Sequence, residues 1–150
     1  MEVYQIKALR KQFDAIGQAI ETLPKTKQTL EAADSSFFAK AWLGKALGVM
    51  DTESPYKNDG KREKVEDIEP TSDQANIEMH KDWEDYTEIK KIDWLREKTK
   101  ETIKRLDFLL TEDKGTKAGV FVRWSYKSAC ESRFWLGFRL ESIREDEKKA

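Results

Sequence analysis

The sequence predicts an all-α protein made of two tandem antiparallel helical hairpins that form a bundle. Trp-Leu-Gly occurs twice, at 42–44 and 135–137, and each copy has a basic residue two positions before the Trp and a Leu three positions after the Gly. Apolar residues recur at three- and four-residue spacing, and no convincing strand pattern interrupts them. One hairpin cannot bury its own apolar face, so the duplication indicates that the copies pack on each other or on further chains.

The first hairpin spans residues 1–50. Its first helix is expected over 3–23, and Pro24 suits the first turn of a second helix over 24–50, where a missing N–H costs nothing. The short turn makes the two helices antiparallel neighbours. Asp34-Ser35-Ser36 either lies within the second helix or caps a fresh helix start. The apolar seam of the first helix, spaced 3, 4, 3, 4, 3, is Ile6, Leu9, Phe13, Ile16, Ile20 and Leu23.

Residues 51–76 differ in composition from the rest of the chain. They hold two of the three prolines and Asn58-Asp59-Gly60, with almost no large apolar residues. A structureless loop of this length is uncommon inside a compact domain. We therefore expect a linker between the two hairpins.

The second hairpin spans residues 77–150. A third helix is expected over 77–110, with Thr99 and Thr102 interrupting its apolar face, and a turn over 111–115 follows. A fourth helix is expected over 116–147, with a charged end that frays.

Composition excludes several classes of function. The 150 residues carry a net charge of −1, so no broad cationic surface indicates a nucleic-acid partner. No apolar run reaches the roughly 18 residues of a membrane span, and no secretory signal is seen, so we expect no membrane partner. The single cysteine, Cys130, fits a reducing cytoplasm. The single histidine, His80, argues against a His-rich metal site or a Ser-His-Asp triad.

Two cations fall beside apolar seams. Arg133 lies on the stripe of the fourth helix, and its repeat counterpart Lys40 lies beside Phe37 and Ala41. A buried charge needs a partner, which an anion such as a phosphate would supply. The alternative is an aliphatic stem on the core with the charged head in water or paired with a glutamate.

Aromatic residues are the second chemical signal. Arg123-Trp124-Ser125-Tyr126-Lys127 places rings and cations within two helical turns. Rings stack on nucleobases while cations hold phosphates. The alternative is that the rings are core anchors. All five tryptophans fall under these alternatives: Trp42, Trp83, Trp94, Trp124 and Trp135.

Other features point to packing rather than catalysis. Gly44 and Gly137 indicate close helix approach or room for a ligand. Cys130 has Lys127 and Arg133 about one turn away, which would lower its pKa, but a buried structural thiol is the better interpretation. No metal cluster, phosphate-binding glycine loop or nucleophile–base pair is recognisable, so we expect no enzyme and no cofactor.

The repeated segments resemble a family of phage proteins, the anti-CBASS and anti-Thoeris sponges that share a helical hairpin domain. Ile6-Lys7-Ala8-Leu9 is similar to the first helix of that domain, and Ala41-Trp42-Leu43-Gly44-Lys45-Ala46-Leu47 is similar to the second. Arg123-Trp124 and Phe134-Trp135-Leu136-Gly137 resemble a further copy of that second helix. The resemblance implies oligomers that bind cyclic oligonucleotides or cyclic ADP-ribose signals between protomers, in the cytoplasm of the infected host cell, without cleaving them.

The resemblance also implies roles for particular residues. Lys7 matches a family lysine that lies near the ligand, and Tyr4 is the available aromatic residue upstream of it. In the second copy Asp93 stands where the lysine would be, although Tyr86 remains available for stacking. Whether both copies bind is left open.

We therefore expect a homo-oligomeric sponge with no catalytic or metal site. The alternative is a structural or adaptor protein whose aromatic seams bind a protein partner. A sponge should have a concave pocket lined by cations, whereas an adaptor should have a flat apolar patch. The predicted ligand-binding residues are Tyr4, Lys7, Lys40, Arg123, Trp124, Tyr126, Lys127 and Arg133.

Overall fold

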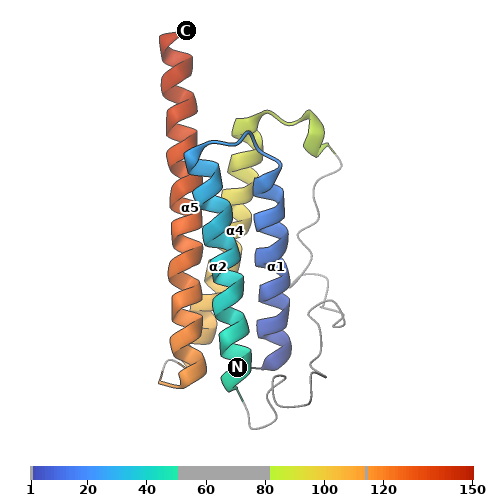
Figure 1. Ribbon diagram of the computed structural model, residues 1–150, viewed down its shortest axis with the longest axis vertical. Coiled ribbons are helices and arrows are strands. Elements are labelled where there is room, and N and C mark those ends of the chain that lie inside the picture. Colours follow the sequence, from blue (N-terminus) through green and yellow to red (C-terminus); the bar gives the residue numbers. More distant parts are fainter. Residues whose placement is uncertain (1, 51–81, 114) are drawn as a thin grey trace.

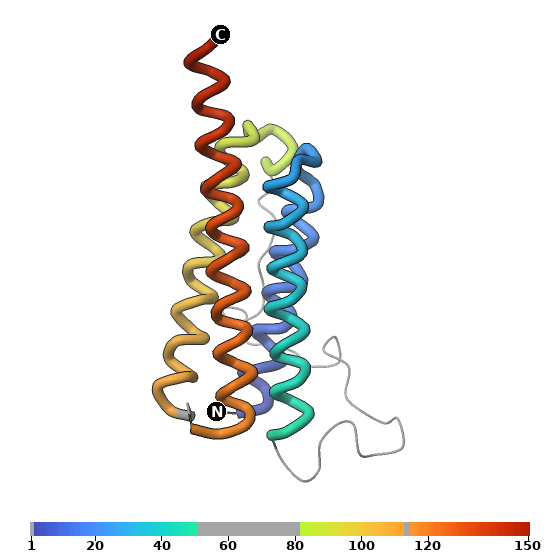
Figure 2. The backbone as a smooth tube through the Cα atoms, turned by 60° about the vertical axis from the view of Figure 1, so that its left-hand side comes forward, coloured from blue at the N-terminus to red at the C-terminus, as the bar shows by residue number. Residues whose placement is uncertain are grey.

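Helices α1 and α2 form one antiparallel hairpin, helices α4 and α5 form the other, and the two hairpins lie side by side as a four-helix bundle (Figures 1 and 2). This computed structural model describes residues 2–50, 82–113 and 115–150. It confirms the all-α bundle, while the predicted linker over 51–76 lies outside the described residues. The elements are α1 (Val3–Glu21), α2 (Lys27–Val49), the short 3₁₀ helix η2 (Trp83–Asp85), α4 (Glu88–Asp113) and α5 (Lys117–Lys149).

Helix α2 begins later than its proline suggests. Thr26 is its N-cap: the Thr26 hydroxyl accepts from the Thr29 N–H at 3.1 Å, and the Thr29 hydroxyl accepts from the Thr26 N–H at 2.9 Å. This reciprocal pair satisfies two otherwise unpaired donors, so the prediction that Pro24 lies in the first turn was wrong. The helix continues through residues 34–36, where Ser36 donates to the Phe13 carbonyl at 2.9 Å, so no second start occurs there.

Helix α4 also begins later than predicted, at Glu88 rather than at residue 77. The Thr87 hydroxyl accepts from the Lys90 N–H at 3.2 Å and caps the helix. Before it, η2 buries Trp83, whose indole N–H donates to the Thr22 hydroxyl at 3.1 Å. Burial of this large ring against the end of α1 favours a separate short turn over a continuous helix.

The core consists of the seam that the sequence predicts, with two threonines inside it. Thr99 and Thr102 are fully buried, and their hydroxyls donate to the carbonyls of Leu95 and Lys98 at 2.8 and 2.9 Å. These bonds satisfy the hydroxyls within α4 itself, so the core tolerates them. The largest buried apolar side chains are Trp83, Phe13, Ile6, Ile16, Ile20, Leu43, Ile92, Leu95, Leu106, Leu136 and Val122.

Helices α2 and α5 make the most extensive contact in the bundle. Ser125 donates to the Ala39 carbonyl and Ser132 to the Ala32 carbonyl, both at 2.8 Å. From Ser125 to Ser132 the chain advances seven residues along α5, while the contacted residue on α2 moves back seven positions. The two helices are therefore antiparallel and pack with a seven-residue repeat. Side chains this small let the two backbones approach closely.

This interface relates the two copies of the repeat. When Trp42 is aligned with Trp135, Ala32 corresponds to Ser125, and position 39 corresponds to position 132. Exchanging the copies therefore exchanges the two Ser–Ala contacts, which is the pattern of an isologous interface about an approximate two-fold axis. The duplicated hairpins pack on each other within one chain.

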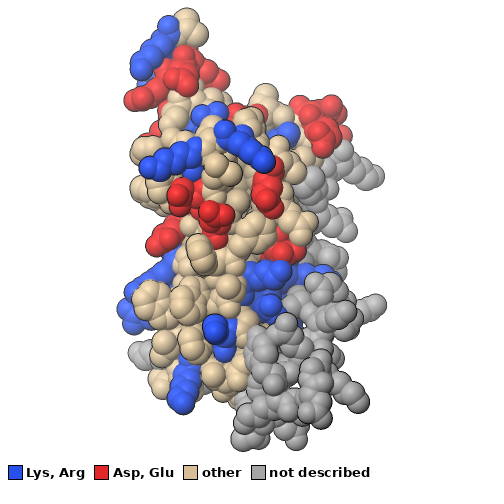
Figure 3. Space-filling model, viewed as in Figure 1, with Lys and Arg blue, Asp and Glu red and all other residues tan. Residues whose placement is uncertain are grey.

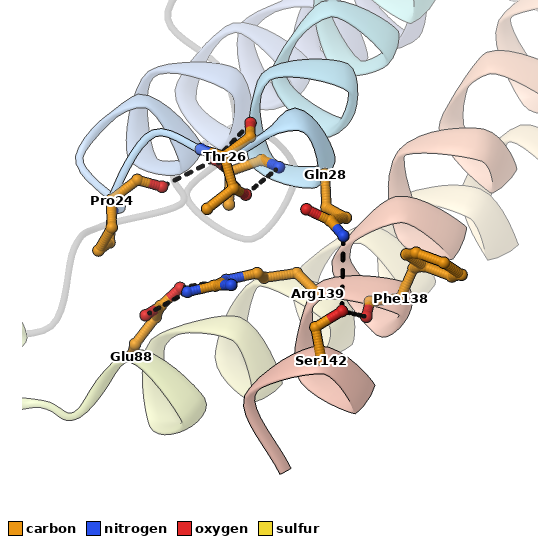
Figure 4. A network of polar contacts seen from close by, with 8 residues as sticks. Pro24, Thr26, Gln28, Glu88, Phe138, Arg139 and Ser142 are labelled. Atoms are coloured by element: carbon orange, nitrogen blue, oxygen red, sulfur yellow. Dashed lines mark hydrogen bonds and ion pairs between the residues drawn. The ribbon is translucent and has the colours of Figure 1, made fainter. Parts of the chain in front are cut away.

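Polar contacts join three helices at the end of the bundle that holds the α1–α2 turn (Figure 4). Arg139 of α5 donates to both carboxylate oxygens of Glu88 of α4, at 2.8 and 3.2 Å. Gln28 of α2 donates to the Ser142 hydroxyl at 3.4 Å. Beyond these contacts the end of α5 extends past the other helices (Figures 1 and 2).

Candidate functional site

A groove of about 290 Å³ lies where the end of α4 meets the start of α5. Thr116 caps α5 by accepting from the Gly119 N–H at 2.9 Å, which fixes the first turn of the helix beside the groove. Arg123 and Lys127, both exposed, belong to its wall. The complete lining is Leu110, Gly119, Val120, Arg123, Trp124 and Lys127. Three of the eight predicted ligand-binding residues therefore line the same groove.

The indole ring of Trp124 is held in place yet accessible. It stacks on Trp42 with ring centroids 5.7 Å apart, and Trp42 stacks in turn on Phe121 at 5.9 Å. The Lys127 ammonium lies 4.7 Å from the Trp124 ring centroid, and Trp124 is 46% exposed. Trp42 is thus a packing residue, whereas Trp124 also presents a surface beside two cations.

One face of this end of the bundle carries mainly positive charge. On the face seen in Figure 3, the lower part of the described surface shows Lys and Arg side chains and no Asp or Glu, while acidic side chains gather above. The lower ends of α2 and α5 lie in that part (Figure 1). An anion approaching there meets a favourable field despite the net charge of −1.

The predicted residues of the first copy are not part of this groove. Tyr4 is 51% exposed at the start of α1, whereas the side chain of Lys7 is buried, with 2% exposed. Lys40 forms an ion pair with Asp14, with 2.8 Å between Nζ and Oδ1. Lys40 thus follows the alternative of a carboxylate partner, although that partner is an aspartate and not the predicted glutamate.

Arg133 and Tyr126 face a different side of α5. The Arg133 Nε–H donates to the Arg96 carbonyl of α4 at 3.4 Å, and Tyr126 hydrogen-bonds with Cys130. Burial, followed by the nearby Arg133 charge, lowers the pKa of Arg96. Within the described residues, neither Arg96 nor Arg133 has a carboxylate in an ion pair. Arg133 lies ten residues beyond Arg123, roughly 15 Å along the helix, so it is not part of the groove.

Cys130 is a partly buried thiol. Burial raises its pKa, and this outweighs the opposing effects of the Tyr126 hydrogen bond and the Arg133 charge. The thiol form therefore dominates at neutral pH, in line with a structural role rather than a reactive one.

Two arginines near the repeated glycines were not predicted from the sequence. The Arg10 side chain lies 3.5 Å from the point where a β-carbon would stand at Gly44, and Arg96 lies 3.4 Å from the corresponding point at Gly137. Each glycine makes room for a guanidinium from the neighbouring helix. The available signal was that an arginine directly follows the matching segments 6–9 and 92–95.

A second hollow, of about 320 Å³, lies between α1 and α4. Its wall holds two cations, Lys104 and Arg105, but none of the predicted residues. Its remaining lining is Gln5, Ala8, Leu9, Phe108 and Leu109. The described residues bring no indole or tyrosine ring to this hollow, unlike the groove beside Trp124.

Among the described residues no group of three His, Cys, Asp or Glu side chains is placed to hold a metal ion, and no helix has the length and apolar character needed to cross a membrane. The chain matches none of the family models, curated proteins or solved structures with which it was compared.

Proposed function

We propose that the protein binds and sequesters a small cyclic nucleotide, without cleaving it, in the groove beside Trp124. The observation that carries the proposal is the juxtaposition of Arg123, Lys127 and the half-exposed Trp124 ring around one hollow. An indole ring offers a stacking surface for a base, and two cations offer charge-assisted contacts for phosphates.

The magnitudes fit a binding protein. Each charge-assisted contact contributes about 1.5–3 kcal/mol, and a stacked base contributes about 1–3 kcal/mol. The volume of about 290 Å³ is near the lower limit, roughly 300 Å³, of small-molecule sites. One nucleotide unit fills the groove, and the rest of a cyclic ligand lies outside it.

The proposed role follows from the resemblance of the repeats to phage sponges. Such a protein lowers the free concentration of an immune signal in the cytoplasm of an infected cell. Stoichiometric binding is sufficient for this role, and no turnover is needed.

Calorimetry across cyclic di- and trinucleotides and cyclic ADP-ribose isomers tests the proposal. We expect one ligand class to bind, Arg123→Met and Lys127→Met each to weaken its affinity at least tenfold, and the ligand to be recovered unchanged. Arg133→Met is the matched control, because it removes a cation from the same helix outside the groove, and we expect affinity within twofold of the parent. No binding by any member of the panel, or equal losses in Arg123→Met and Arg133→Met, would overturn the assignment.

A second candidate is binding of a protein partner. Phe134 and Phe138 are 63% and 44% exposed on α5, and their rings stack on each other with centroids 6.2 Å apart. Exposed stacked rings of this kind are typical of interaction surfaces. Loss of a bound protein on Phe134→Ser, with nucleotide affinity unchanged, would favour this function.

A further inference from the structure

Helix α5 has a second seam, on the side that faces away from the bundle. Six residues follow one another at spacings of 4, 3, 4, 3 and 4, which is the spacing of a coiled-coil stripe. All six are exposed, whereas the opposite stripe of α5 forms the bundle core. This outer seam consists of Val120, Trp124, Lys127, Glu131, Phe134 and Phe138.

The outer seam has the same order of residue types whether it is followed from Val120 or from Phe138. Two apolar residues are followed by one charged residue, and the two charged residues at the centre have opposite signs. Inverting the seam about its midpoint places Lys127 on Glu131, Trp124 on Phe134 and Val120 on Phe138, with every spacing preserved. A surface that is complementary to its own inverted copy is what an isologous dimer requires.

We propose that the outer seam is a homodimer interface in which α5 packs antiparallel on α5 of a second copy of the chain. Lys127 of each copy then meets Glu131 of the other, which forms two equivalent ion pairs. Trp124 meets Phe134 of the second copy, and Val120 meets Phe138. Because the groups are related by a two-fold axis, the dimer closes and does not grow further.

Charge decides the direction of pairing. A parallel arrangement in register would oppose Lys127 to Lys127 and Glu131 to Glu131, which is destabilising. Within the described residues neither side chain forms an ion pair, and the Lys127 ammonium lies 4.7 Å from the Trp124 ring centroid. Both charges are thus available for pairing between copies.

The length and composition of the seam suit a reversible dimer. From residue 120 to residue 138 the helix rises roughly 27 Å, which is more than two heptads. Three of its apolar residues are aromatic, a class of residue that is enriched at protein interfaces. Val120 is 49% exposed and Phe134 is 63% exposed. Formation of the dimer would remove this apolar surface from water.

The outer seam and the groove share Val120, Trp124 and Lys127, but Glu131, Phe134 and Phe138 belong to the seam alone. The dimer does not rest on the proposed nucleotide binding, but it engages Trp124 and Lys127, so a ligand in the groove and a second copy of the chain compete for these two side chains. Variants at the three unshared positions therefore test association without altering the groove of the same copy.

A charge exchange is the sharpest test, read by sedimentation equilibrium of the full chain. We expect the parent to reach twice the mass of the chain. Glu131→Lys and Lys127→Glu should each raise the dimer dissociation constant at least tenfold, because each variant opposes like charges. The double variant, Lys127→Glu with Glu131→Lys, restores opposite signs at every contact and should return the constant to within threefold of the parent. A monomeric parent up to millimolar concentration, or a double variant as weak as the singles, would overturn the proposal.

A matched pair of aromatic variants tests the apolar part. Phe138→Glu should weaken the dimer at least tenfold. Phe38→Glu, which changes a side chain 61% exposed on α2 and outside the seam, should leave the dissociation constant within twofold. Thermal unfolding of both variants checks that each is folded. Equal weakening by the two variants would show that association uses another surface.

Discussion

The guanidinium of Arg96 lies against Gly137, 3.4 Å from the position that a β-carbon would occupy. Gly137 follows Trp135-Leu136, and the first copy repeats the arrangement with Arg10 against Gly44. The glycine of each Trp-Leu-Gly segment thus contacts an arginine from the other helix of the same hairpin. This assigns the repeated glycine to close packing, one of the two alternatives that the sequence allows.

Gly137→Ala is expected to stabilise the protein. The new methyl group meets Arg96 at an ordinary contact distance, while alanine is better than glycine inside a helix by about 1 kcal/mol. We expect the free energy of unfolding in urea to rise by about 0.5–1 kcal/mol. Gly44→Ala is the matched variant in the first copy and should behave alike. A loss of stability in both would show that the guanidiniums tolerate no displacement.

Gly17→Ala is expected to have the opposite effect. A β-carbon at Gly17 would stand 2.7 Å from the Phe37 ring, so that ring must move. Overpacking costs about 1–3 kcal/mol, which exceeds the gain in helix propensity. Urea unfolding should show a net loss, and Phe37→Leu combined with Gly17→Ala should recover part of it. An increase in stability for Gly17→Ala alone would contradict this account.

The small residues between α2 and α5 give a third prediction. Ser132→Ala removes one hydrogen bond, to the Ala32 carbonyl, and should cost about 1 kcal/mol. Ser132→Leu inserts a large side chain into a fully buried position and should cost at least about 2–3 kcal/mol. Ser142→Leu, near the end of the same helix, is the control for a partly exposed position: it removes the hydrogen bonds of Ser142 with Gln28 and the Phe138 carbonyl but does not place a leucine in a fully buried position. Equal effects of Ser132→Leu and Ser142→Leu would show that the helices do not approach closely.

Alkaline pH is expected to destabilise the fold through Cys130. Burial raises the pKa of this thiol in the folded chain, so the folded state favours the neutral form. Its contribution to stability is fully present below the ordinary thiol pKa and is lost as pH rises through the raised folded value. Cys130→Ala should reduce the loss of unfolding free energy between neutral and alkaline pH. Tyr126→Phe is the companion variant that separates the two groups, because the Cys130 charge and then burial raise the pKa of Tyr126 as well.

Iodoacetamide gives an independent readout of the same thiol. The folded protein should react with a pH profile displaced to higher pH than that of the chain unfolded in urea. Coincident profiles would show that burial does not shift the pKa of Cys130.

The helices were predictable because their apolar spacing is regular over many turns. The seam from Ile6 to Ile20 lies within α1, and Leu23 follows the end of the helix at Glu21. The starts of α2 and α4 were mistaken because capping is decided by single hydroxyls. The Thr26 hydroxyl accepts from the Thr29 N–H, and the Thr87 hydroxyl accepts from the Lys90 N–H. These two hydrogen bonds fix the first turns of α2 and α4, and the apolar spacing gives no sign of them.

The groove was only partly predictable. Arg123, Trp124 and Lys127 are adjacent on one helix, so sequence proximity brings them together. Tyr4, Lys7 and Lys40 depend on how the hairpins pack, which local spacing does not determine. Lys40 meets Asp14 across two helices, a contact that no pattern within either helix contains.

The shared axis between α2 and α5 has a consequence for divergence. In a dimer of identical subunits, every substitution is present in both subunits. In a single chain whose two halves differ in sequence, a substitution changes one half alone. Both serines of the α2–α5 contacts come from α5 and both alanines from α2. The covalent link thus permits one half to specialise in recognition while the other retains the scaffold.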